Sequence, residues 1–300
     1  MSDRTDNVRQ AMENAYDLHV HSAPDVMPRK GDDIDFAKRV VAAGMGGFVL
    51  KSHHVPTAGR ASLVNKVLER DVAYGAIALN NFVGGLNPMA VDVAGRLGAK
   101  VVWMPTVDSQ NEANKIHSQD TSKLPYWASL HRELAAQGRL KPPVQVTRED
   151  GSLVPDAIEV LDLIRDYGMI LATGHLSPAE TVQVIKVAKS RGLDRIIVTH
   201  PEFPTTRFSI SEQRDLMAYG VYFERCYTTP ATGKVSWEEM LAAIRETGPE
   251  HNVISTDLGQ PQALYLDDGL ADFCQHLLEA GFAATVINRM TSQNPGNLLH

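Results

Sequence analysis

Short apolar runs alternate with longer amphipathic stretches along the whole 300-residue chain. The short runs are rich in aliphatic and β-branched residues, as buried strands are, and the longer stretches repeat apolar residues at helical spacing. Several of the longer stretches begin at Ser or Asp and end near Gly, as helices commonly do, for example 32–45, 177–192 and 211–220. The pattern predicts eight strands, over residues 16–20, 47–51, 72–79, 100–105, 168–174, 195–200, 221–226 and 252–257.

Eight strands that alternate with helices are typical of a (β/α)8 TIM barrel, an α/β fold with a parallel sheet. An open doubly wound sheet is the competing architecture. No linker rich in Pro, Gly or Ser interrupts the chain, so residues 1–300 are expected to form a single domain. The regular spacing is broken by an insertion over 107–154, which ends in a predicted hairpin with Asp150 and Gly151 in its turn. Insertions of this length commonly cover an active site, so we expect a lid there.

The composition narrows the function classes. The formal net charge is −7 and no cluster of Lys and Arg occurs, which argues against nucleic acid or anionic lipid as a partner. No apolar run approaches the roughly 20 residues of a membrane span, and the polar start "MSDRTDNVRQ" does not resemble a signal peptide, so we expect a cytoplasmic protein. Two cysteines, Cys226 and Cys274, are too few for a disulfide framework, and both are expected to stay reduced.

The first candidate functional residues lie in the first predicted strand, in the segment "YDLHVHSAPD". Alternate residues of a strand face the same side, so His19 and His21 are expected to point into one space while Leu18 and Val20 point away. Two imidazoles on one face suit a metal ion. The remaining ligands of such a site must come from other strands.

Polar residues also stand at the carboxyl ends of other predicted strands, where TIM barrels carry their active sites. They are Lys51, His53 and His54 after the second strand, His175 after the fifth, His200 at the sixth, Glu224 and Arg225 in the seventh, and Asp257 at the eighth. Imidazole and carboxylate ligands without thiolate favour zinc, with manganese, iron or cobalt as alternatives. Asp257 is the expected proton-transfer residue, because the eighth strand of a closed barrel lies beside His19 and His21.

Four further residues are candidates for substrate contact. His53 lies on the same face as Lys51, but a turn at the strand end would direct His54 to the site instead, and we expect at least one of the two to touch substrate or metal. Glu224 either contacts the site or pairs with a nearby arginine. Arg207 either binds a substrate carboxylate through its planar fork or remains a solvated loop charge. The histidines away from strand ends are expected to be structural or on the surface: His117, His131, His251, His276 and His300.

The order of these residues resembles that of the amidohydrolase superfamily of metal-dependent hydrolases. Its members carry His-x-His on strand 1, single histidines on strands 5 and 6 and an aspartate on strand 8, and "HVH", His175, His200 and Asp257 match these places. The segment "NPGNLL" looks like the closing Asn-Pro segment of the family. The resemblance spans nearly the whole chain. It implies one or two divalent ions and cleavage of an amide, cyclic amide or lactone bond of a small molecule by metal-activated hydroxide.

The sequence departs from the superfamily pattern at strand 4. Many members carry a carboxylated lysine there as a bridging ligand, whereas "VVWMPTV" offers none. Lys51, at the end of the second strand, is the candidate for a carboxylated bridge, and Glu224 is an alternative that needs no modification. An ordinary ion pair of Lys51 is the simpler interpretation. The number of metal ions therefore stays open.

Alternative functions compete with this interpretation. "DLHVHS" followed by "SHHVPTAGRA" resembles the polymerase-and-histidinol-phosphatase (PHP) family of barrel phosphoesterases. In that case Lys51, Arg60, Arg207 and Arg225 are the basic residues available to hold a phosphate. A decarboxylase on the same barrel is another alternative, and so is a barrel whose metal is only structural. Barrels of this size often form homo-oligomers.

Overall fold

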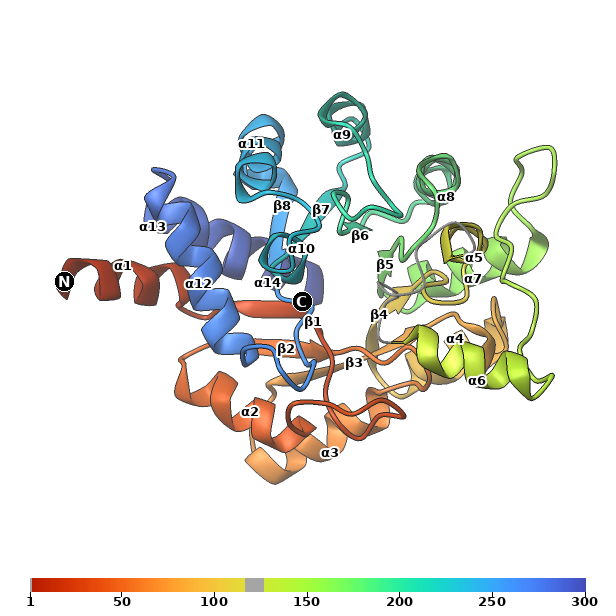
Figure 1. Ribbon diagram of the computed structural model, residues 1–300, viewed down its shortest axis with the longest axis horizontal. Coiled ribbons are helices and arrows are strands. Elements are labelled where there is room, and N and C mark those ends of the chain that lie inside the picture. The colour runs from red at the N-terminus through yellow and green to blue at the C-terminus, as the bar shows by residue number, and fades with distance from the viewer. Residues whose placement is uncertain (1, 117–126) are drawn as a thin grey trace.

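The computed structural model describes residues 2–116 and 127–300, and over these residues the chain forms a parallel eight-stranded barrel with helices around it (Figure 1). Each strand pairs in parallel with the next, in the order β1 to β8. The strands are β1 Tyr16–Val20, β2 Gly47–Leu50, β3 Ala73–Ala78, β4 Ala99–Trp103, β5 Ile170–Ala172, β6 Ile196–Thr199, β7 Tyr222–Cys226 and β8 Asn252–Ser255. The predicted (β/α)8 fold is therefore confirmed, and all eight predicted strands are present.

Helices between and after the strands cover the outside of the barrel (Figure 1). They are α1 Ser2–Met12, α2 Asp33–Ala42, α3 Ala58–Leu68, α4 Pro88–Arg96, α5 Gln110–Ile116, α6 Ala128–Ala136, α7 Pro155–Asp166, α8 Pro178–Ser190, α9 Ile210–Met217, α10 Thr228–Ala231, α11 Trp237–Thr247, α12 Leu266–Glu279, α13 Ala284–Asn288 and α14 Asn294–Leu299. Short turns of helix occupy η1 Asn81–Val83, η3 Pro249–His251 and η4 Arg289–Gln293. None of the helices described combines the length and apolar character needed to cross a bilayer.

Three helices that the sequence predicts begin where their capping residues require. Asp32, Ser177 and Ser209 each accept a hydrogen bond from a backbone amide in the first turn of α2, α8 and α9. In each case the third residue of the helix is acidic and its side chain accepts from the backbone of the cap. This reciprocal capping satisfies amides that the helix itself leaves unpaired.

The barrel closes where β8 reaches β1. The backbone amide of Asp257 donates to the carbonyl oxygen of His19 at 2.8 Å, and the amide of His21 donates to the carbonyl oxygen of Leu258 at 2.8 Å. An isolated parallel bridge joins Val20 to Leu258. The open doubly wound alternative is therefore wrong, because its edge strands would remain apart.

An irregularity in β1 changes the expected alternation of side chains. The β1–β2 register shifts between Asp17 and Val20. As a result Leu18 packs among the residues that fill the barrel interior, whereas Val20 packs in the layer between strands and outer helices. The prediction that Leu18 points away from the barrel interior is wrong, because alternation holds only in an unbroken strand.

The amino-terminal end of the barrel is closed by its own side chains. Interior residues such as Val49, Val101 and Trp103 fill the barrel, and Leu298 and Leu299 of α14 belong to the same cluster. Asn294, from the "NPGNLL" segment, donates to the carbonyl oxygens of Pro249 and Asn252 at 2.8 and 2.7 Å and so holds α14 in place. Access to the barrel interior therefore remains at the carboxyl ends of the strands.

The insertion after β4 contains the predicted hairpin. Thr147 and Leu153 form an antiparallel bridge, and the amide of Arg148 donates to the carbonyl oxygen of Ser152 at 2.8 Å. Gly151 occupies the turn with a φ of +80°, a conformation that favours glycine. Part of the predicted lid, including His117, lies outside the described residues. Its role as a lid stays a prediction.

A buried polar network ties β7 to the helices outside the barrel. The Arg225 side chain is fully buried, and it donates to Gln213 at 2.8 Å, to Asn252 at 2.6 Å and to Thr247 at 3.0 Å. It also forms an ion pair with Glu202, which is only 3% exposed. A buried ion pair stabilises a fold only when its partners remain together.

We predict that Arg225→Met lowers the free energy of unfolding by about 3–5 kcal/mol, because it leaves the Glu202 carboxylate buried without its cation. Urea denaturation of purified protein measures the change. The control is Arg96→Met, which breaks the exposed pair with Asp92 and should leave the unfolding transition in place. Equal stability of the two variants would contradict the structural importance of the network.

Candidate metal centre

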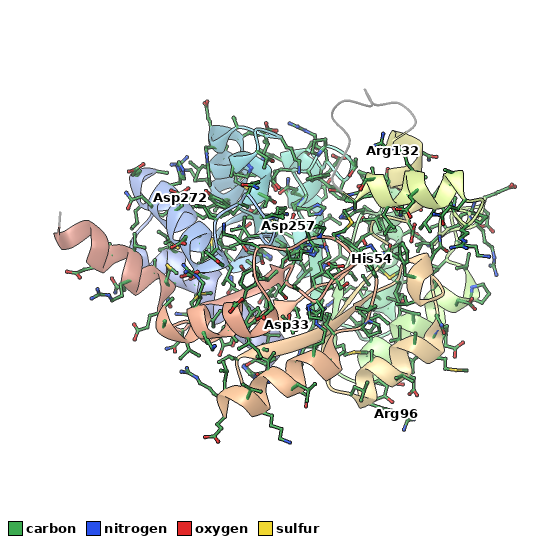
Figure 2. The ribbon with its side chains drawn as sticks, turned by 60° about the horizontal axis from the view of Figure 1, so that its bottom comes forward. Asp33, His54, Arg96, Arg132, Asp257 and Asp272 are labelled. Atoms are coloured by element: carbon green, nitrogen blue, oxygen red, sulfur yellow. The ribbon has the colours of Figure 1, made fainter. Side chains whose placement is uncertain are left out.

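A cavity of about 460 Å³ opens at the carboxyl ends of the strands. Its lining includes five imidazoles, the Lys51 side chain and one carboxylate: His19, His21, His53, His175, His200, Lys51 and Asp257. Figure 2 shows Asp257 toward the middle of the molecule and Arg96 at its edge. The six residues predicted to ligate metal therefore converge on one space.

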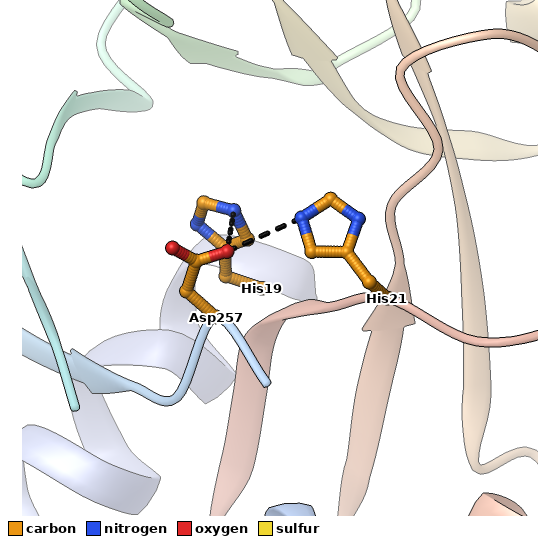
Figure 3. A group of neighbouring side chains, drawn as sticks. All are labelled: His19, His21 and Asp257. Atoms are coloured by element: carbon orange, nitrogen blue, oxygen red, sulfur yellow. Dashed lines mark ion pairs between the residues drawn. The ribbon is translucent and has the colours of Figure 1, made fainter. Parts of the chain in front are cut away.

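His19, His21 and Asp257 form the first part of the centre (Figure 3). Asp257 Oδ1 lies 3.1 Å from His19 Nε2 and 3.2 Å from His21 Nε2. Bonds of about 2.0–2.1 Å in a tetrahedral zinc site would set neighbouring ligand atoms about 3.3 Å apart. The two distances to Asp257 Oδ1 thus match the separation of neighbouring ligands, and the ligand atoms of the three residues all lie within 4.8 Å of one another.

His175 and His200 form the second part. Their Nε2 atoms face one another at 3.2 Å. Thr206 uses its hydroxyl proton in a bond to the carbonyl oxygen of His200, so at 3.3 Å it can only accept from His200 Nδ1. The Glu112 carboxylate lies 2.8 Å from His175 Nδ1 and favours a proton there. If each ring carries its proton on Nδ1, the two Nε2 lone pairs face one another, an arrangement that a cation between them would stabilise.

The imidazole of His19 is oriented in the same way. Its Nδ1 lies 3.1 Å from the Glu224 carboxylate, which also accepts from Ser255 at 3.0 Å. A proton on Nδ1 of the neutral ring would direct the lone pair of Nε2 toward the cavity. Carboxylates behind metal-binding histidines commonly fix the ring and the tautomer in this way.

His53 and His21 are held differently. His53 Nδ1 lies 2.8 Å from the Thr106 hydroxyl, which already accepts from Asn80 and can itself donate, so the tautomer of His53 is not fixed. His21 Nδ1 lies 3.4 Å from Arg29 Nη2, a long contact that is strong only if Nδ1 is unprotonated. Binding a cation through Nε2 would instead place a proton on His21 Nδ1.

The backbone is strained at two candidate ligands. His200 has a φ of +29° and Asp257 has a φ of +55°, in the left-handed region that non-glycine residues seldom adopt. Such conformations persist when surrounding contacts hold them, and they gather at functional sites. The closure of the barrel beside Asp257 supplies such contacts.

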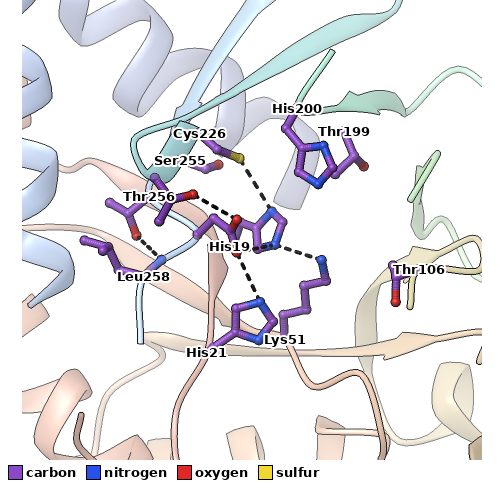
Figure 4. Close-up of polar contacts among 12 residues, drawn as sticks. His19, His21, Lys51, Thr106, Thr199, His200, Cys226, Ser255, Thr256 and Leu258 are labelled. Carbon is purple, nitrogen blue, oxygen red and sulfur yellow. Dashed lines mark hydrogen bonds and ion pairs between the residues drawn. The ribbon is translucent and has the colours of Figure 1, made fainter. Parts of the chain in front are cut away.

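Lys51 enters the centre from β2 (Figure 4). Its Nζ lies 2.8 Å from His19 Nε2 and 5.0 Å from the centre of the Trp103 ring. Burial lowers the pKa of Lys51, although the nearby Asp257 and Glu224 carboxylates oppose the shift. The Lys51 nitrogen therefore occupies the place beside His19 Nε2 that a metal ion bound to this atom would take.

Burial and neighbouring charge keep most of the imidazoles neutral. Burial, reinforced by the Arg29 charge, lowers the pKa of His21 to about 3. Burial also holds the pKa values of His53 and His200 well below the usual value. Burial raises the pKa of Asp257, but the adjacent histidines outweigh it and hold that pKa well below its usual range. Neutral imidazoles and an ionised carboxylate are the forms that bind metal.

Three residues predicted to contact substrate do not reach the cavity. Glu224 is buried behind His19 and orients that ring. His54 is buried against Asp25, with Nδ1 and Oδ1 3.0 Å apart, and only its neighbour His53 lines the cavity. Arg207 is half exposed and pairs with a carboxylate outside the cavity. Arg207 therefore lies outside the cavity, and its role in substrate binding stays a prediction.

The basic residues proposed for a phosphoesterase are also engaged elsewhere. Arg60 pairs with Asp33 at 2.6 Å, and Arg225 pairs with Glu202 on the outer side of the sheet. Neither arginine lines the cavity. Of the four residues that favoured this alternative, Lys51 alone reaches the centre.

Several residues of the site were not identified from the sequence. Glu112 comes from α5 in the insertion, and nothing in its local sequence marks it as the partner of His175. Arg29 and Lys234 line the cavity from the loops after β1 and β7. A search of all loops at the carboxyl ends of strands for charged residues would have found the two cations, since this is where barrel sites are built.

A second group of potential ligands lies behind His19. The atoms of His19, Glu224 and Cys226 are close enough to hold an ion. Burial raises the pKa of the Cys226 thiol well above its ordinary value, so this sulfur remains protonated and is a poor ligand. The imidazoles and Asp257 that face the cavity fit a divalent cation better, and their nitrogen and oxygen donors suit zinc.

Comparison with known proteins extends this picture. The sequence matches the family described as Family of unknown function (DUF6282) over residues 14–224. A search of curated proteins found no match.

Solved structures share the fold at low sequence identity. An amidohydrolase from Pseudomonas aeruginosa is 12% identical, with a TM-score of 0.63 and 97% of each chain covered. The probable dipeptidase PvdM from Pseudomonas aeruginosa is 10% identical, with a TM-score of 0.65 over 99% of this chain and 97% of that one. A metallo peptidase from Rhodobacter sphaeroides, liganded with a phosphinate mimic of the dipeptide L-Ala-D-Ala, is 11% identical, with a TM-score of 0.60 over 96% and 99%. The resemblance to amidohydrolase-type barrels is confirmed at the level of the fold.

We predict that protein purified without chelator carries a divalent metal, measured by elemental analysis, and that His200→Ala reduces the metal bound per chain. Removing this imidazole leaves the lone pair of His175 with no second ligand opposite it. The control is His276→Ala, which alters a partly exposed histidine of α12. A wild-type protein that takes up no divalent ion, even after incubation with zinc, would contradict the assignment.

Proposed function

The chain belongs to DUF6282, a family of unknown function, and from that starting point we propose that it is a metal-dependent hydrolase that cleaves an amide, cyclic amide or lactone bond of a small molecule. The observation that carries the proposal is the pair of Nε2 atoms of His175 and His200, which lie 3.2 Å apart in an open cavity that Asp257 also lines. A purely structural metal would need no such opening.

The residues that would hold the metal are His19, His21 and Asp257 on one side and His175 and His200 on the other. A divalent cation held there lowers the pKa of water and polarises a carbonyl oxygen. We expect zinc, since the donors are imidazole nitrogens and carboxylate oxygens. The four imidazoles lie at or just beyond the ends of three strands, β1, β5 and β6, so the barrel sets their positions.

Asp257 is the proposed proton-transfer residue. Its Oδ1 faces the two histidines of β1, whereas its Oδ2 accepts a hydrogen bond from Thr228 at 3.0 Å. Because its pKa lies well below the usual range, the carboxylate is ionised at neutral pH and can accept a proton from the attacking water. It then returns that proton to the leaving group of the substrate.

The cavity favours a substrate of modest size. A volume of about 460 Å³ suits a small molecule and not a protein chain. Phe203 and Trp127 line the same cavity as the imidazoles and give it apolar walls. The polar centre would therefore hold the scissile group, and the aromatic walls would hold its substituents.

We predict that Asp257→Asn lowers kcat by about 10²–10⁴-fold, because the amide cannot accept the proton. Wild-type protein loaded with zinc is assayed against N-acetyl amino acids, hydantoin and γ-butyrolactone by proton release, with p-nitrophenyl phosphate as the phosphoester comparison. The metal content of the variant is measured alongside, which separates loss of proton transfer from loss of the ion. Turnover of the phosphoester alone would favour the PHP-type alternative and contradict the proposal.

Lys51 is proposed to bridge two ions after carboxylation. The buried Lys51 ammonium first releases a proton. The neutral amine then adds to the carbon of carbon dioxide and releases a second proton, and the product is a carbamate with two oxygen ligands in place of the ammonium beside His19. The indole N–H of Trp103 has no acceptor among the described residues, and its ring lies next to Lys51. Carbamate oxygens would bring acceptors into the space beside that ring.

We predict that Lys51→Met lowers the zinc content from about two ions per chain to one, because the bridging ligand is lost. Labelling with ¹³C-bicarbonate tests the modification directly, since a carbamate carbon gives a resonance that the variant lacks. The exposed Lys66→Met on α3 is the matched control and should leave both readouts unchanged. One zinc per wild-type chain and no carbamate signal would rule out the bridge.

A further inference from the structure

The cavity is positively charged although the protein is acidic. The chain has a formal net charge of −7. Leaving aside Lys51, which is the proposed carbamate, Arg29 and Lys234 are the cations of the cavity lining and Asp257 is its acid, which gives two minus one, or +1, before any metal is bound. A concave site with charge opposite to the rest of the surface attracts ligands of the other sign.

The Arg29 side chain is held in place at the wall of this cavity by hydrogen bonds to Asp25. Its side chain is only 6% exposed, and its Nε and Nη2 donate to the same oxygen of Asp25 at 2.9 and 2.6 Å. The other oxygen of Asp25 accepts from His54 at 3.0 Å and from the amide of Val26 at 2.7 Å. The acceptor sites of Asp25 are therefore used, and the guanidinium is fixed against the cavity wall.

Arg29 has donors that the protein itself does not use. Asp25 takes Nε and one proton of Nη2, and none of the hydrogen bonds described involves Nη1. The second Nη2 proton faces His21 Nδ1 at 3.4 Å. A His21 that presents its Nε2 lone pair to a cation carries a proton on Nδ1 and no longer accepts from Arg29. The loaded centre thus leaves Arg29 donors without an acceptor at the edge of the cavity.

Lys234 is the second cation available to a ligand. It lies in the loop between α10 and α11, with its Nζ 4.4 Å from the centre of the Phe203 ring, which also lines the cavity. No carboxylate pairs with it among the described residues. Arg29 follows β1 and Lys234 follows β7, so the two cations flank the loop after β8 that carries Asp257.

From this arrangement we infer that the substrate carries a carboxylate, which Arg29 and Lys234 bind while the scissile bond lies at the imidazole centre. The inference rests on the proposed function, whose substrate class it names. Arg29 fixes the orientation of the acid through its guanidinium, and Lys234 adds charge at the rim. A carboxylate matches this pair better than a phosphate dianion, because Asp25 already neutralises most of the Arg29 charge. This is the role that the sequence suggested for Arg207.

The test uses glutarate and its uncharged counterpart glutaramide as probes, with affinity measured by titration calorimetry. Wild-type protein should bind glutarate at least about tenfold more tightly than glutaramide, and Arg29→Met should remove that preference. Measurements on zinc-loaded and metal-free protein separate a carboxylate held by Arg29 from one held by the ion. The preference should persist without metal.

Two further variants keep the test decisive. Lys234→Met alters an exposed residue that the fold does not need, and it should weaken glutarate binding even if Arg29→Met fails to fold. Lys30→Met removes the same charge beside Arg29, but its side chain packs over Tyr265 outside the cavity lining, so glutarate affinity should not change.

The outcomes distinguish this inference from the proposed function. Equal affinity for glutarate and glutaramide, or full glutarate binding in both Arg29→Met and Lys234→Met, would overturn it. Binding of inorganic phosphate without binding of glutarate would overturn it as well. Glutarate binding that depends on Arg29, in a protein that hydrolyses no amide or lactone, would support the inference and contradict the proposed function alone.

Discussion

The contact between β1 and β8 is the constraint on which the centre depends. Two backbone hydrogen bonds join these strands, from Asp257 to His19 and from His21 to Leu258. They bring a carboxylate and two imidazoles together from positions more than two hundred residues apart, and they hold Asp257 in a left-handed conformation. The same closure removes the exposed edges that an open sheet would have. The contact between β1 and β8 therefore both stabilises the barrel and sets the geometry of the site.

Around this contact, the polar groups that the chain buries act in pairs. Glu224 stands behind His19 and Glu112 stands behind His175, so two inward-facing imidazoles have a carboxylate on the outer side. In each pair, a proton on Nδ1 would leave a lone pair directed into the cavity. Burial lowers the pKa of most of the imidazoles, which keeps them neutral. Neutral imidazoles that direct a nitrogen lone pair into the cavity would bind a divalent cation there.

The sequence predicted most of the fold and the centre. The eight strands could be predicted because buried parallel strands are short apolar runs bounded by turns, and capping residues marked the starts of α2 and α8. The start of α9 was predicted at Ser211, whereas Ser209 caps it. The residues facing the cavity were found because a barrel carries its chemistry at strand ends. The direction of Leu18 was missed because a register shift in β1 leaves no local signal. Glu112 was missed because it lies in a helix of the insertion, α5, whose partner is far away in the sequence, and Arg29 was missed because it lies in a loop, where no period indicates the direction of a side chain.

What the sequence by itself determined is the set of strands, their order and the residue types at their ends, since hydrophobic period and turn residues are local properties. Only the tertiary structure decided which of those residues share one space. It turned His53 toward the cavity and His54 toward Asp25, placed Glu224 behind His19, and carried Arg207 to the surface. These outcomes depend on the closure of the barrel and on the path of each loop, which arise from contacts between distant segments. The local sequence pattern identifies the candidate ligand residues, and the closed barrel determines which groups surround each of them.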